Sequence, residues 1–330
     1  MKILIADDSR ISRMAVENIL KTSKHQLIFA EDGEKALEIW KQESPEVLIT
    51  DIMMPRIDGI ELIRQIRSRP TMQYTYIIVM TGKNERSGFL NSYENGADDF
   101  LAKPVQHAEL HSRLIAAQRI VQLQQSQMVL YTIGQVLEAR DLETGNHIER
   151  VQIYTKRLAI QLRKNSKFAK QMTDCFIDTV ALSSTLHDIG KVGISDLILR
   201  KTGRYTPEEF DMMKKHTLIG AEIIDKVQTR FPNAEFLQIS KEVILSHHEK
   251  YDGSGYPQGL VGDEIPLSAR IVALADVYDA LRSQRVYKEA YDHDRAMRII
   301  MDSSGKHFDP DIVNAFLEIA NEFNDISKKI

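Results

Sequence analysis

The chain has 330 residues, enough for two domains at the usual size of about 150 residues each. Hydrophobic residues make up 43% and charged residues 27%, a composition typical of globular proteins. The formal net charge of −4 provides no electrostatic basis for non-specific binding to DNA or RNA, so we expect no nucleic-acid partner.

Cysteine content and hydropathy indicate the compartment. Cys175 is the one cysteine, which excludes an internal disulfide and a zinc finger and is typical of a reducing compartment. Asp7 and Asp8 come too early for a signal peptide, and no run approaches the ~18 consecutive apolar residues of a membrane helix. We therefore predict a cytoplasmic protein that has no membrane partner.

The first third of the chain alternates short β-rich apolar runs with helical patterns. This alternation predicts an α/β doubly wound fold with a five-stranded parallel sheet, in which ligands bind beyond the carboxyl ends of the strands. The predicted strands are 3–6, 27–30, 47–50, 77–81 and 99–102, and the first two helices are 11–21 and 33–42.

A long helical pattern without proline follows, from Ala108 to about Asp141. Along it runs a stripe at alternating spacings of four and three, formed by Leu110, Leu114, Ala117, Val121, Gln124, Met128 and Tyr131. The stripe fits a coiled-coil seam that joins two copies of the chain into a homodimer. It fits equally a helix that packs on its own domains, because Gln124 and the small Ala117 weaken the seam.

Strand signals disappear after Glu138, and helical patterns dominate to the end. The second domain is therefore predicted to be all-α, with helices at 148–164, 175–186, 207–214, 237–247, 269–281 and 311–321. The predicted organisation is an α/β domain over 1–120, a linker helix over 121–140 and an all-α domain over 141–330.

Polar side chains gather at one edge of the predicted sheet. Asp7 and Asp8 follow the first strand and Asp51 the third, while Thr81 ends the fourth and Lys103 follows the fifth. Three neighbouring carboxylates repel one another unless a cation joins them, and oxygen ligands of this kind suit Mg²⁺. Together with the hydroxyl and the lysine they form a site that can accept a phosphoryl group.

Four motifs make this segment resemble the receiver domains of two-component response regulators: Ala-Asp-Asp at 6–8, Asp-Ile-Met-Met-Pro at 51–55, Met-Thr-Gly at 80–82 and Ala-Lys-Pro at 102–104. The resemblance implies a cis peptide before Pro104 and a sensor histidine kinase as partner. The implied roles are phosphoacceptor for Asp51, Mg²⁺ ligand for Asp7, Asp8 and Asp51, and switch residue for Thr81, Lys103 and Phe100.

Five histidines of the all-α domain occur in a pattern that suits a metal site: His147, His187, His216, His247 and His248. Asp188 follows His187 directly, which offers a nitrogen and an oxygen ligand at one helix end. Glu143 lies four residues before His147, a spacing that places both on one face of a helix or of its first turn.

Adjacent histidines on a helix point about 100° apart, so we expect His247 and His248 to reach two different ions. Asp276 is then a candidate bridge, and Asp279 one turn later is placed to orient a ligating histidine. Imidazole and carboxylate ligands without cysteine suit Fe, Mn, Ni or Zn in a hydrolytic role. Two or more such ions can bind a phosphodiester and activate water, so a multinuclear hydrolase is predicted.

Residues 130 to about 325 resemble the HD-GYP branch of the HD phosphohydrolases, which implies hydrolysis of the second messenger cyclic di-GMP. The motifs are Glu-Thr-Gly-Asn-His at 143–147, His-Asp-Ile-Gly-Lys at 187–191, His-His-Glu-Lys-Tyr-Asp-Gly-Ser-Gly-Tyr-Pro at 247–257, Ala-Asp-Val-Tyr-Asp at 275–279 and Arg-Val-Tyr-Lys at 285–288. The implied metal ligands are His187, Asp188, His216, His247, His248 and Asp276. The resemblance implies Asp188 and Lys191 as catalytic residues, with Lys191, Tyr256, Arg285 and Lys288 as substrate contacts.

Glu143 refines this interpretation. The resemblance to this family implies that a glutamate four residues before the first histidine indicates a centre with three metal ions. Glu143 with His147 therefore implies a trinuclear site rather than a dinuclear one, with iron as the metal and manganese as the alternative, and pGpG or GMP as product. The residue-level alternative is that Glu143 caps the first turn of a helix.

Three functions remain open from the sequence. The first is a phosphorylation-regulated enzyme, the second a cyclic di-GMP sensor or interaction module that keeps its metal site, and the third an HD phosphohydrolase of another nucleotide. The complete ligand set and the Gly-Tyr-Pro loop favour the enzyme, because a protein that only binds has no need of every ligand. The sequence indicates neither the kinase nor the direction of the effect of phosphorylation.

Overall fold

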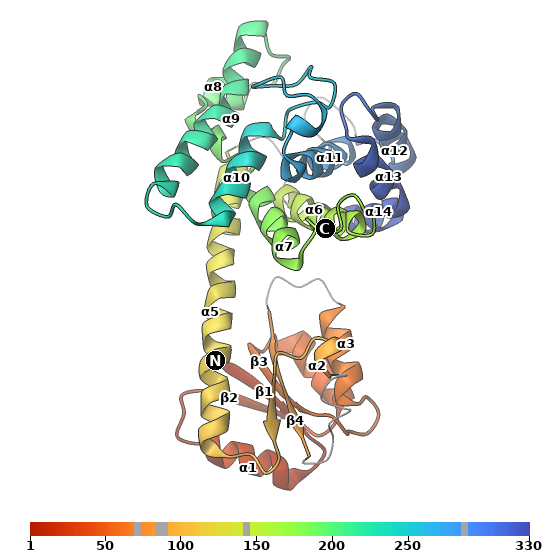
Figure 1. Ribbon diagram of the computed structural model, residues 1–330. Helices are drawn as coiled ribbons and strands as arrows, with labels where there is room; N and C mark the ends of the chain where they lie inside the picture. The colour runs from red at the N-terminus through yellow and green to blue at the C-terminus, as the bar shows by residue number, and fades with distance from the viewer. Residues whose placement is uncertain (69–73, 83–91, 141–145, 285–289) are drawn as a thin grey trace. The chain divides into compact units, whose positions relative to one another are not determined.

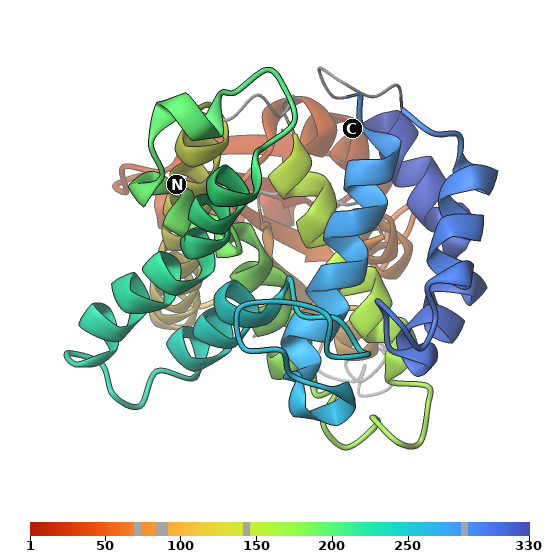
Figure 2. The same cartoon turned by 90° about the horizontal axis from the view of Figure 1, so that it is seen from above.

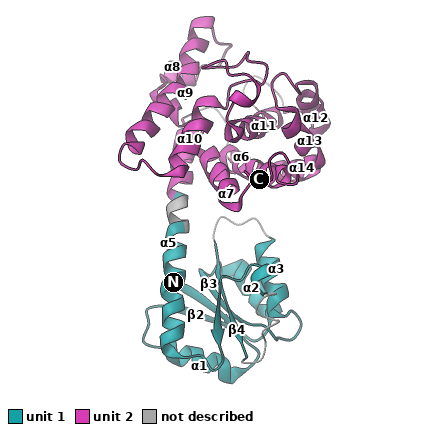
Figure 3. Ribbon diagram, in the orientation of Figure 1, with its two compact units in different colours: residues 1–128 teal, residues 129–330 magenta. Residues whose placement is uncertain are grey.

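A computed structural model describes residues 1–68, 74–82, 92–140, 146–284 and 290–330, with 124–127 described by backbone alone (Figure 1). The chain divides into two compact units, residues 1–128 and 129–330 (Figure 3). The boundary falls inside α5 (His107–Glu138). No helix among the described residues is long and apolar enough to cross a membrane.

Unit 1 is built on a parallel sheet of order β2-β1-β3-β4-β5. Its strands are β1 (Lys2–Ala6), β2 (Gln26–Ala30), β3 (Val47–Asp51), β4 (Tyr76–Thr81) and β5 (Asp99–Ala102). Helices α1 (Arg10–Leu20) and α5 contribute to the apolar cluster on one face, and α2 (Gly33–Glu43) and α3 (Gly59–Arg67) to that on the other. Because both faces are covered, residues 3–6 and 76–80 are buried without alternation. The predicted doubly wound fold is confirmed.

The stripe on α5 is filled from within unit 1 over its first half. Leu110, Leu114, Ala117 and Val121 are buried in the cluster that includes Ile5 of β1. These four positions therefore do not form a seam with a second copy, and here the helix packs on its own domain. The side chain of Gln124 lies outside the described residues. Dimerisation itself stays a prediction.

Unit 2 is helical, and its described residues contain no strand, only isolated bridges. The all-α prediction is confirmed. Its helices are α6 (His147–Leu162), α7 (Asp174–Ser183), α8 (Asp196–Leu199), α9 (Pro207–Gln228), α10 (Glu235–Ser246), α11 (Leu267–Arg282), α12 (His293–Asp302), α13 (Pro310–Glu318) and α14 (Ala320–Lys329), with 3₁₀ turns η1 (Ser184–Leu186), η2 (Ile189–Gly193) and η3 (Gly262–Glu264).

The helices of unit 2 differ from the sequence prediction in several places, and α8 and α14 were not predicted. The helix predicted at 175–186 tightens into η1 after Ser183, which changes the direction of the chain before His187. α9 continues to Gln228, beyond the predicted end at 214, because Ala221 and Ile224 are buried on its face. α12 was not predicted, although Ala296 and Ile300 are buried on one of its faces and Met297 packs beside them.

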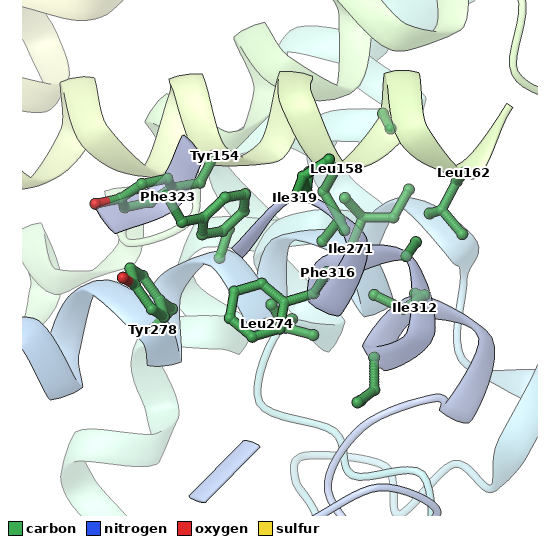
Figure 4. Packing of buried hydrophobic residues seen from close by; sticks show 14 of the residues in the cluster. Tyr154, Leu158, Leu162, Ile271, Leu274, Tyr278, Ile312, Phe316, Ile319 and Phe323 are labelled. Atoms are coloured by element: carbon green, nitrogen blue, oxygen red, sulfur yellow. The ribbon is translucent and has the colours of Figure 1, made fainter. Parts of the chain in front are cut away.

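The main core of unit 2 lies between α6, α11, α13 and α14 (Figure 4). Tyr154 stacks on Phe323 at a centroid distance of 4.4 Å, and Tyr278 contacts Phe316 at 5.5 Å. α11, in blue near the centre of Figure 2, contacts α6, α10, α12 and α13. This packing fixes the helices from which the polar side chains described below extend.

Truncation of Phe316 tests the importance of this core. The Phe316→Ala variant should lower the free energy of unfolding of unit 2 by about 3–5 kcal/mol, because a fully buried ring is replaced by a cavity. Far-ultraviolet circular dichroism follows this transition, whereas fluorescence of the single tryptophan, Trp40, reports the core of unit 1 and should not change. An unchanged midpoint of the helical transition would contradict the assignment.

Candidate phosphoacceptor site and metal centre

The acidic side chains of unit 1 meet beyond the carboxyl ends of β1 and β3. One carboxylate oxygen from each of Asp7, Asp8 and Asp51 lies within 4.8 Å of the others. Lys103 Nζ lies 2.8 Å from Asp7 Oδ2 and 2.7 Å from Asp51 Oδ2. Burial raises the pKa of Asp51, and the ammonium of Lys103 opposes that rise. The arrangement offers the oxygen ligands that Mg²⁺ prefers.

The other predicted receiver residues surround this group. Thr81 ends β4 and pairs in register with Ala102, next to Lys103. Phe100 is buried, with its ring against Tyr93 at a centroid distance of 4.5 Å. The peptide between Lys103 and Pro104 is cis, as the resemblance implied. The structure thus places all of these residues at one sheet edge or beside it, while their roles in phosphorylation stay predictions.

The histidines and aspartates of unit 2 converge from several elements. His147 begins α6, His187 and Asp188 lie between η1 and η2, His216 lies in α9, His247 and His248 follow α10, and Asp276 lies in α11. Their ligand atoms form two groups, each within 4.8 Å: Asp188, His216, His247 and His248, and then His147, His187 and Asp276.

Asp188 lies between the two groups. Its Oδ1 is 3.3 Å from His216 Nε2 and 3.8 Å from His247 Nε2, while its Oδ2 is 3.2 Å from His187 Nε2. Asp188 thus approaches histidines of both groups, Asp276 lies with His147 and His187, and His247 and His248 fall in one group, while the expectations that Asp276 bridges two ions and that His247 and His248 reach different ions stay predictions. His247 and His248 directly follow α10, and the centroids of their rings lie 4.0 Å apart.

The hydrogen bonds of the histidines fix which nitrogen faces the centre. Nδ1 of His187 donates to Ser184 O at 2.8 Å, Nδ1 of His216 to Met213 O at 2.7 Å, and Nδ1 of His247 to Val243 O at 3.0 Å. A carbonyl oxygen only accepts, so Nδ1 carries a proton in each of these rings, and in a neutral ring Nε2 presents its lone pair to the centre.

Some of these inward-facing atoms make no hydrogen bond to any of the described residues. Nε2 of His216 and of His247 and Oδ1 of Asp188 are buried and make no hydrogen bond to any residue that the structure describes. Buried polar atoms normally have partners, because an unsatisfied one costs about 1–3 kcal/mol. Nitrogen and oxygen lone pairs that converge on one space fit divalent transition-metal ions.

The electrostatics of the group differ from residue to residue. Burial lowers the pKa of His247 to about 3, and the neighbouring His187 adds to the effect. Burial also opposes the charged form of His187, but the Asp188 carboxylate outweighs it and raises the pKa of His187 to about 9. Burial likewise opposes ionisation of Asp188, yet Lys191, with Nζ 2.7 Å from Oδ2, holds the pKa of this carboxyl well below its usual range. The centre therefore contains an ionised carboxylate, which raises the pKa of His187, beside the imidazoles of His216, His247 and His248, whose pKa values burial lowers.

Two glycines allow Asp188 and His216 to meet. A Cβ at Gly190 would lie 1.8 Å from His216 O, and one at Gly220 would lie 2.5 Å from Ile244 Cγ2. The backbone of η2 thus lies directly on that of α9, closer than any side chain permits. This close approach explains the glycine in the His-Asp-Ile-Gly-Lys motif.

Asp279 and Arg150 hold His147 through its Nδ1, the ring nitrogen opposite the one that approaches Asp276. Asp279 Oδ2 accepts from His147 Nδ1 at 2.8 Å, the contact expected from its place one turn after Asp276. Arg150, which the sequence interpretation missed, donates to both carboxylate oxygens of Asp279, at 2.6 and 2.9 Å. Its position three residues after His147, on the same helix face, was the available signal.

Glu138, at the end of α5, was also missed. Its Oε1 accepts from the backbone N–H of His147 at 3.1 Å. Asn146, the residue before α6, makes no side-chain cap, so Glu138 satisfies the first N–H of this helix from outside it. Glu138 also lines a pocket together with His147, His187, Asp188 and Lys191. No local sequence signal identifies it, since the contact depends on how α5 meets α6.

The Gly-Tyr-Pro loop is anchored by Glu249, a third missed residue. Its buried carboxylate accepts from the backbone N–H groups of Gln258, Gly259 and Leu260 at 2.7, 3.1 and 3.2 Å. The anchored loop places the ring of Tyr256 on that of His248, at a centroid distance of 4.8 Å. Tyr256 thereby lies against His248, one of the candidate metal ligands, while its role as a substrate contact stays a prediction.

Three predicted residues, Glu143, Arg285 and Lys288, lie outside the described residues. Asn146 adopts a φ of 71°, so α6 does not extend back through it. The helical spacing of four between Glu143 and His147 therefore does not by itself place the two side chains on one helix face.

Removal of Asp279 should weaken metal binding about 10- to 100-fold, because His147 loses the acceptor that orients it. Metal retained by Asp279→Ala after dialysis against graded chelator measures this loss. The matched control is Asp302→Ala, which alters an exposed aspartate on α12. Equal retention by the two variants, with unchanged helix content, would refute the orienting role.

Comparison with known proteins agrees with this organisation. A response regulator receiver domain model matches residues 3–115, and an HD domain model matches residues 150–312. A protein of Vibrio cholerae named probable cyclic di-GMP phosphodiesterase is 39% identical over 99% of this chain and 79% of its own length. A cyclic di-GMP phosphodiesterase of Thermotoga maritima is 35% identical over 100% of this chain and 93% of its own. A cyclic di-GMP phosphodiesterase response regulator of Xanthomonas campestris is 34% identical, over 96% and 87%. The chain therefore belongs to the response regulators that join an N-terminal receiver domain to a C-terminal HD domain of the HD-GYP type.

Proposed function

We propose that this protein is a metal-dependent phosphodiesterase that hydrolyses cyclic di-GMP under control of receiver phosphorylation. The observation that carries the proposal is the pair of ligand groups on either side of Asp188. Lys191 and Tyr256 adjoin these groups and provide a cation and an aromatic ring for a nucleotide. The names of the relatives support the same substrate. Two of these relatives are 39% and 35% identical over 99% and 100% of this chain.

Different residues would bind the metal ions, contact the phosphate and orient the nucleotide. His147, His187, His216, His247, His248, Asp188 and Asp276 would hold the ions, which when bound supply Lewis acidity toward phosphate oxygens and lower the pKa of water. Lys191 brings a positive charge to the edge of the centre, where it can pair with a phosphate oxygen. The Tyr256 ring limits the open side at His248 and orients the nucleotide. No protein nucleophile is needed.

We further propose iron as the metal, with manganese as the alternative, because mixed imidazole and carboxylate ligands suit both. A third ion, held with Glu143, would complete a trinuclear centre and allow hydrolysis to continue past pGpG to GMP. In the receiver, Mg²⁺ would bind Asp7, Asp8 and Asp51, the oxygen set typical of that ion. The cytoplasm stays the predicted location.

Control by the receiver is supported by the two environments of α5. Its residues from Leu110 to Val121 are buried in the core of unit 1. Near its other end, a Cβ at Gly134 would lie 2.8 Å from Ile148 Cδ1, and Glu138 accepts from His147 N–H. We propose that phosphorylation of Asp51 by a sensor histidine kinase, acting with Thr81, Lys103 and Phe100, alters the contacts of α5 at His147.

Replacement of Asp188 tests the reaction. Asp188→Ala should lower the rate of cyclic di-GMP hydrolysis at least about 10³-fold, because the carboxylate between the groups is lost. Product chromatography on anaerobically purified protein measures the rate, and Asp178→Ala, an exposed aspartate on α7, is the control. Cleavage of a different nucleotide alone would refute the substrate, and binding without cleavage would favour a sensor.

The same preparations settle the ion count. Metal analysis of wild type should give three ions per chain and that of Glu143→Ala two, with pGpG accumulating in the variant. Two ions in both proteins would leave a dinuclear centre and assign Glu143 to the helix cap.

Phosphorylation should change the hydrolysis rate about 5- to 150-fold, the range of ordinary allosteric coupling free energies. The rate is measured with and without a small-molecule phosphodonor such as acetyl phosphate and Mg²⁺. Asp51→Asn cannot accept the phosphoryl group and should show no response. A wild-type rate that is the same in both conditions, with phosphorylation verified by mass, would contradict receiver control.

A further inference from the structure

An exposed aromatic ring lies at the outer side of Tyr256. Phe210, in the first turns of α9, is 45% exposed, and its ring centroid lies 6.1 Å from that of Tyr256 at an interplanar angle of 82°. Tyr256 in turn stacks on His248. The rings of His248, Tyr256 and Phe210 therefore form a row that leads from the metal ligands to the surface. Phe210 belongs to none of the apolar clusters found among the described residues.

A lysine accompanies this ring. Lys214, one turn along α9 from Phe210, places Nζ 5.2 Å from the centroid of Phe210 and 5.9 Å from that of Tyr256. Its ion pair with Asp211, at 2.6 Å, involves an exposed carboxylate and is of the kind that contributes little. The ammonium can therefore exchange this partner for a phosphate. An aromatic face next to a movable cation is a common combination for binding a nucleotide.

The start of α9 holds Phe210 in place. Thr206 Oγ1 accepts from Glu209 N–H at 3.3 Å, and Glu209 Oε2 accepts from Thr206 N–H at 2.7 Å, with Pro207 at the first helical position. This capping box fixes the turn that carries the ring. A backbone turn that is fixed before binding loses little conformational freedom when a base stacks on the ring that it carries. The same helix carries His216, so the ring and the metal ligand share one rigid element.

We propose that Phe210 and Lys214 form a second nucleotide subsite, at which Phe210 stacks on a guanine of the substrate and Lys214 contacts its phosphate. The inference rests on the proposed function, because it concerns the nucleotide that is not being cleaved. When one phosphodiester of a cyclic dinucleotide lies at the metal centre, the other half of the ring must extend to one side. The row of aromatic side chains provides a path for it, and the subsite favours two-base substrates over small phosphodiesters.

The test compares KM and kcat for cyclic di-GMP in the full-length, metal-loaded protein. Phe210→Ala should raise KM about 5- to 150-fold, which corresponds to the binding free energy of one stacked base, and should change kcat less than twofold. Phe210→Leu keeps the apolar volume without the aromatic face and should resemble Phe210→Ala, whereas Phe210→Trp should restore the wild-type KM. Phe231→Ala removes another exposed phenylalanine, beyond the end of α9, and should have no effect.

Lys214→Gln should raise KM and reduce its dependence on salt, because a phosphate contact is lost. Lys215→Gln, the adjacent exposed lysine, is the matched control and should behave as wild type. The metal content of every variant is measured, since a merely structural role of Phe210 in α9 would lower metal content or kcat instead of raising KM alone.

Several outcomes would overturn the subsite. They are a Phe210→Ala variant that matches Phe231→Ala, a loss confined to kcat, and a Phe210→Leu variant with wild-type KM. If wild type binds cyclic di-GMP without cleaving it, the proposed function fails, and dissociation constants from calorimetry on the same variants still decide the subsite. If wild type does not bind cyclic di-GMP at all, both proposals fail.

Discussion

The convergence of buried lone pairs on Asp188 is the constraint on which the second unit depends. Imidazole nitrogens of His187, His216 and His247 face the two oxygens of this one carboxylate at 3.2 to 3.8 Å. Such atoms are costly to bury without partners. A cation between them removes that cost, so metal binding and the folding of this region are expected to support each other. The helices α6, α9, α10 and α11 must all be in register for the ligands to meet.

The apolar core and the close backbone contact have complementary roles in holding this register. The aromatic cluster of Tyr154, Tyr278, Phe316 and Phe323 fixes α6 against α11, which carry His147 and Asp276. Gly190 lets η2 lie on α9, which brings Asp188 to His216. Four residues beyond the ligands hydrogen-bond polar groups that would otherwise lack this partner: Asp279, Arg150, Glu138 and Glu249. Their partners are the His147 ring, the Asp279 carboxylate, the His147 N–H and the N–H groups of the Gly-Tyr-Pro loop. The centre is therefore rigid because its supporting residues are buried and hydrogen-bonded.

α5 is the element through which the first unit can influence this centre. One part of it completes the core of the receiver, and another part ends in the carboxylate that accepts from the first N–H of α6. A change in the packing of this helix would alter the contact between Glu138 and His147. His147 is the first residue of α6 and a candidate ligand. α5 therefore belongs to the apolar core of unit 1 at one end and contacts the candidate ligand His147 at the other, which is the observation behind the proposed control.

The sequence by itself determined the fold class of both units, the edge at which Asp7, Asp51 and Lys103 meet, and the identity of the metal-ligand candidates. The fold class follows from strand and helix periodicity, and the edge follows from the rule that the carboxyl ends of parallel strands lie together. The ligand candidates follow from the spacing of histidines and aspartates together with the resemblance to the HD-GYP proteins. Only the tertiary structure decided which ligand candidates share a group, that Asp188 lies between the groups, and that the first four positions of the stripe on α5 are buried within unit 1. It also revealed Arg150, Glu138 and Glu249, whose partners lie on other elements or on a folded loop. These features depend on where helices end and how closely their backbones approach, and local periodicity carries no information about either.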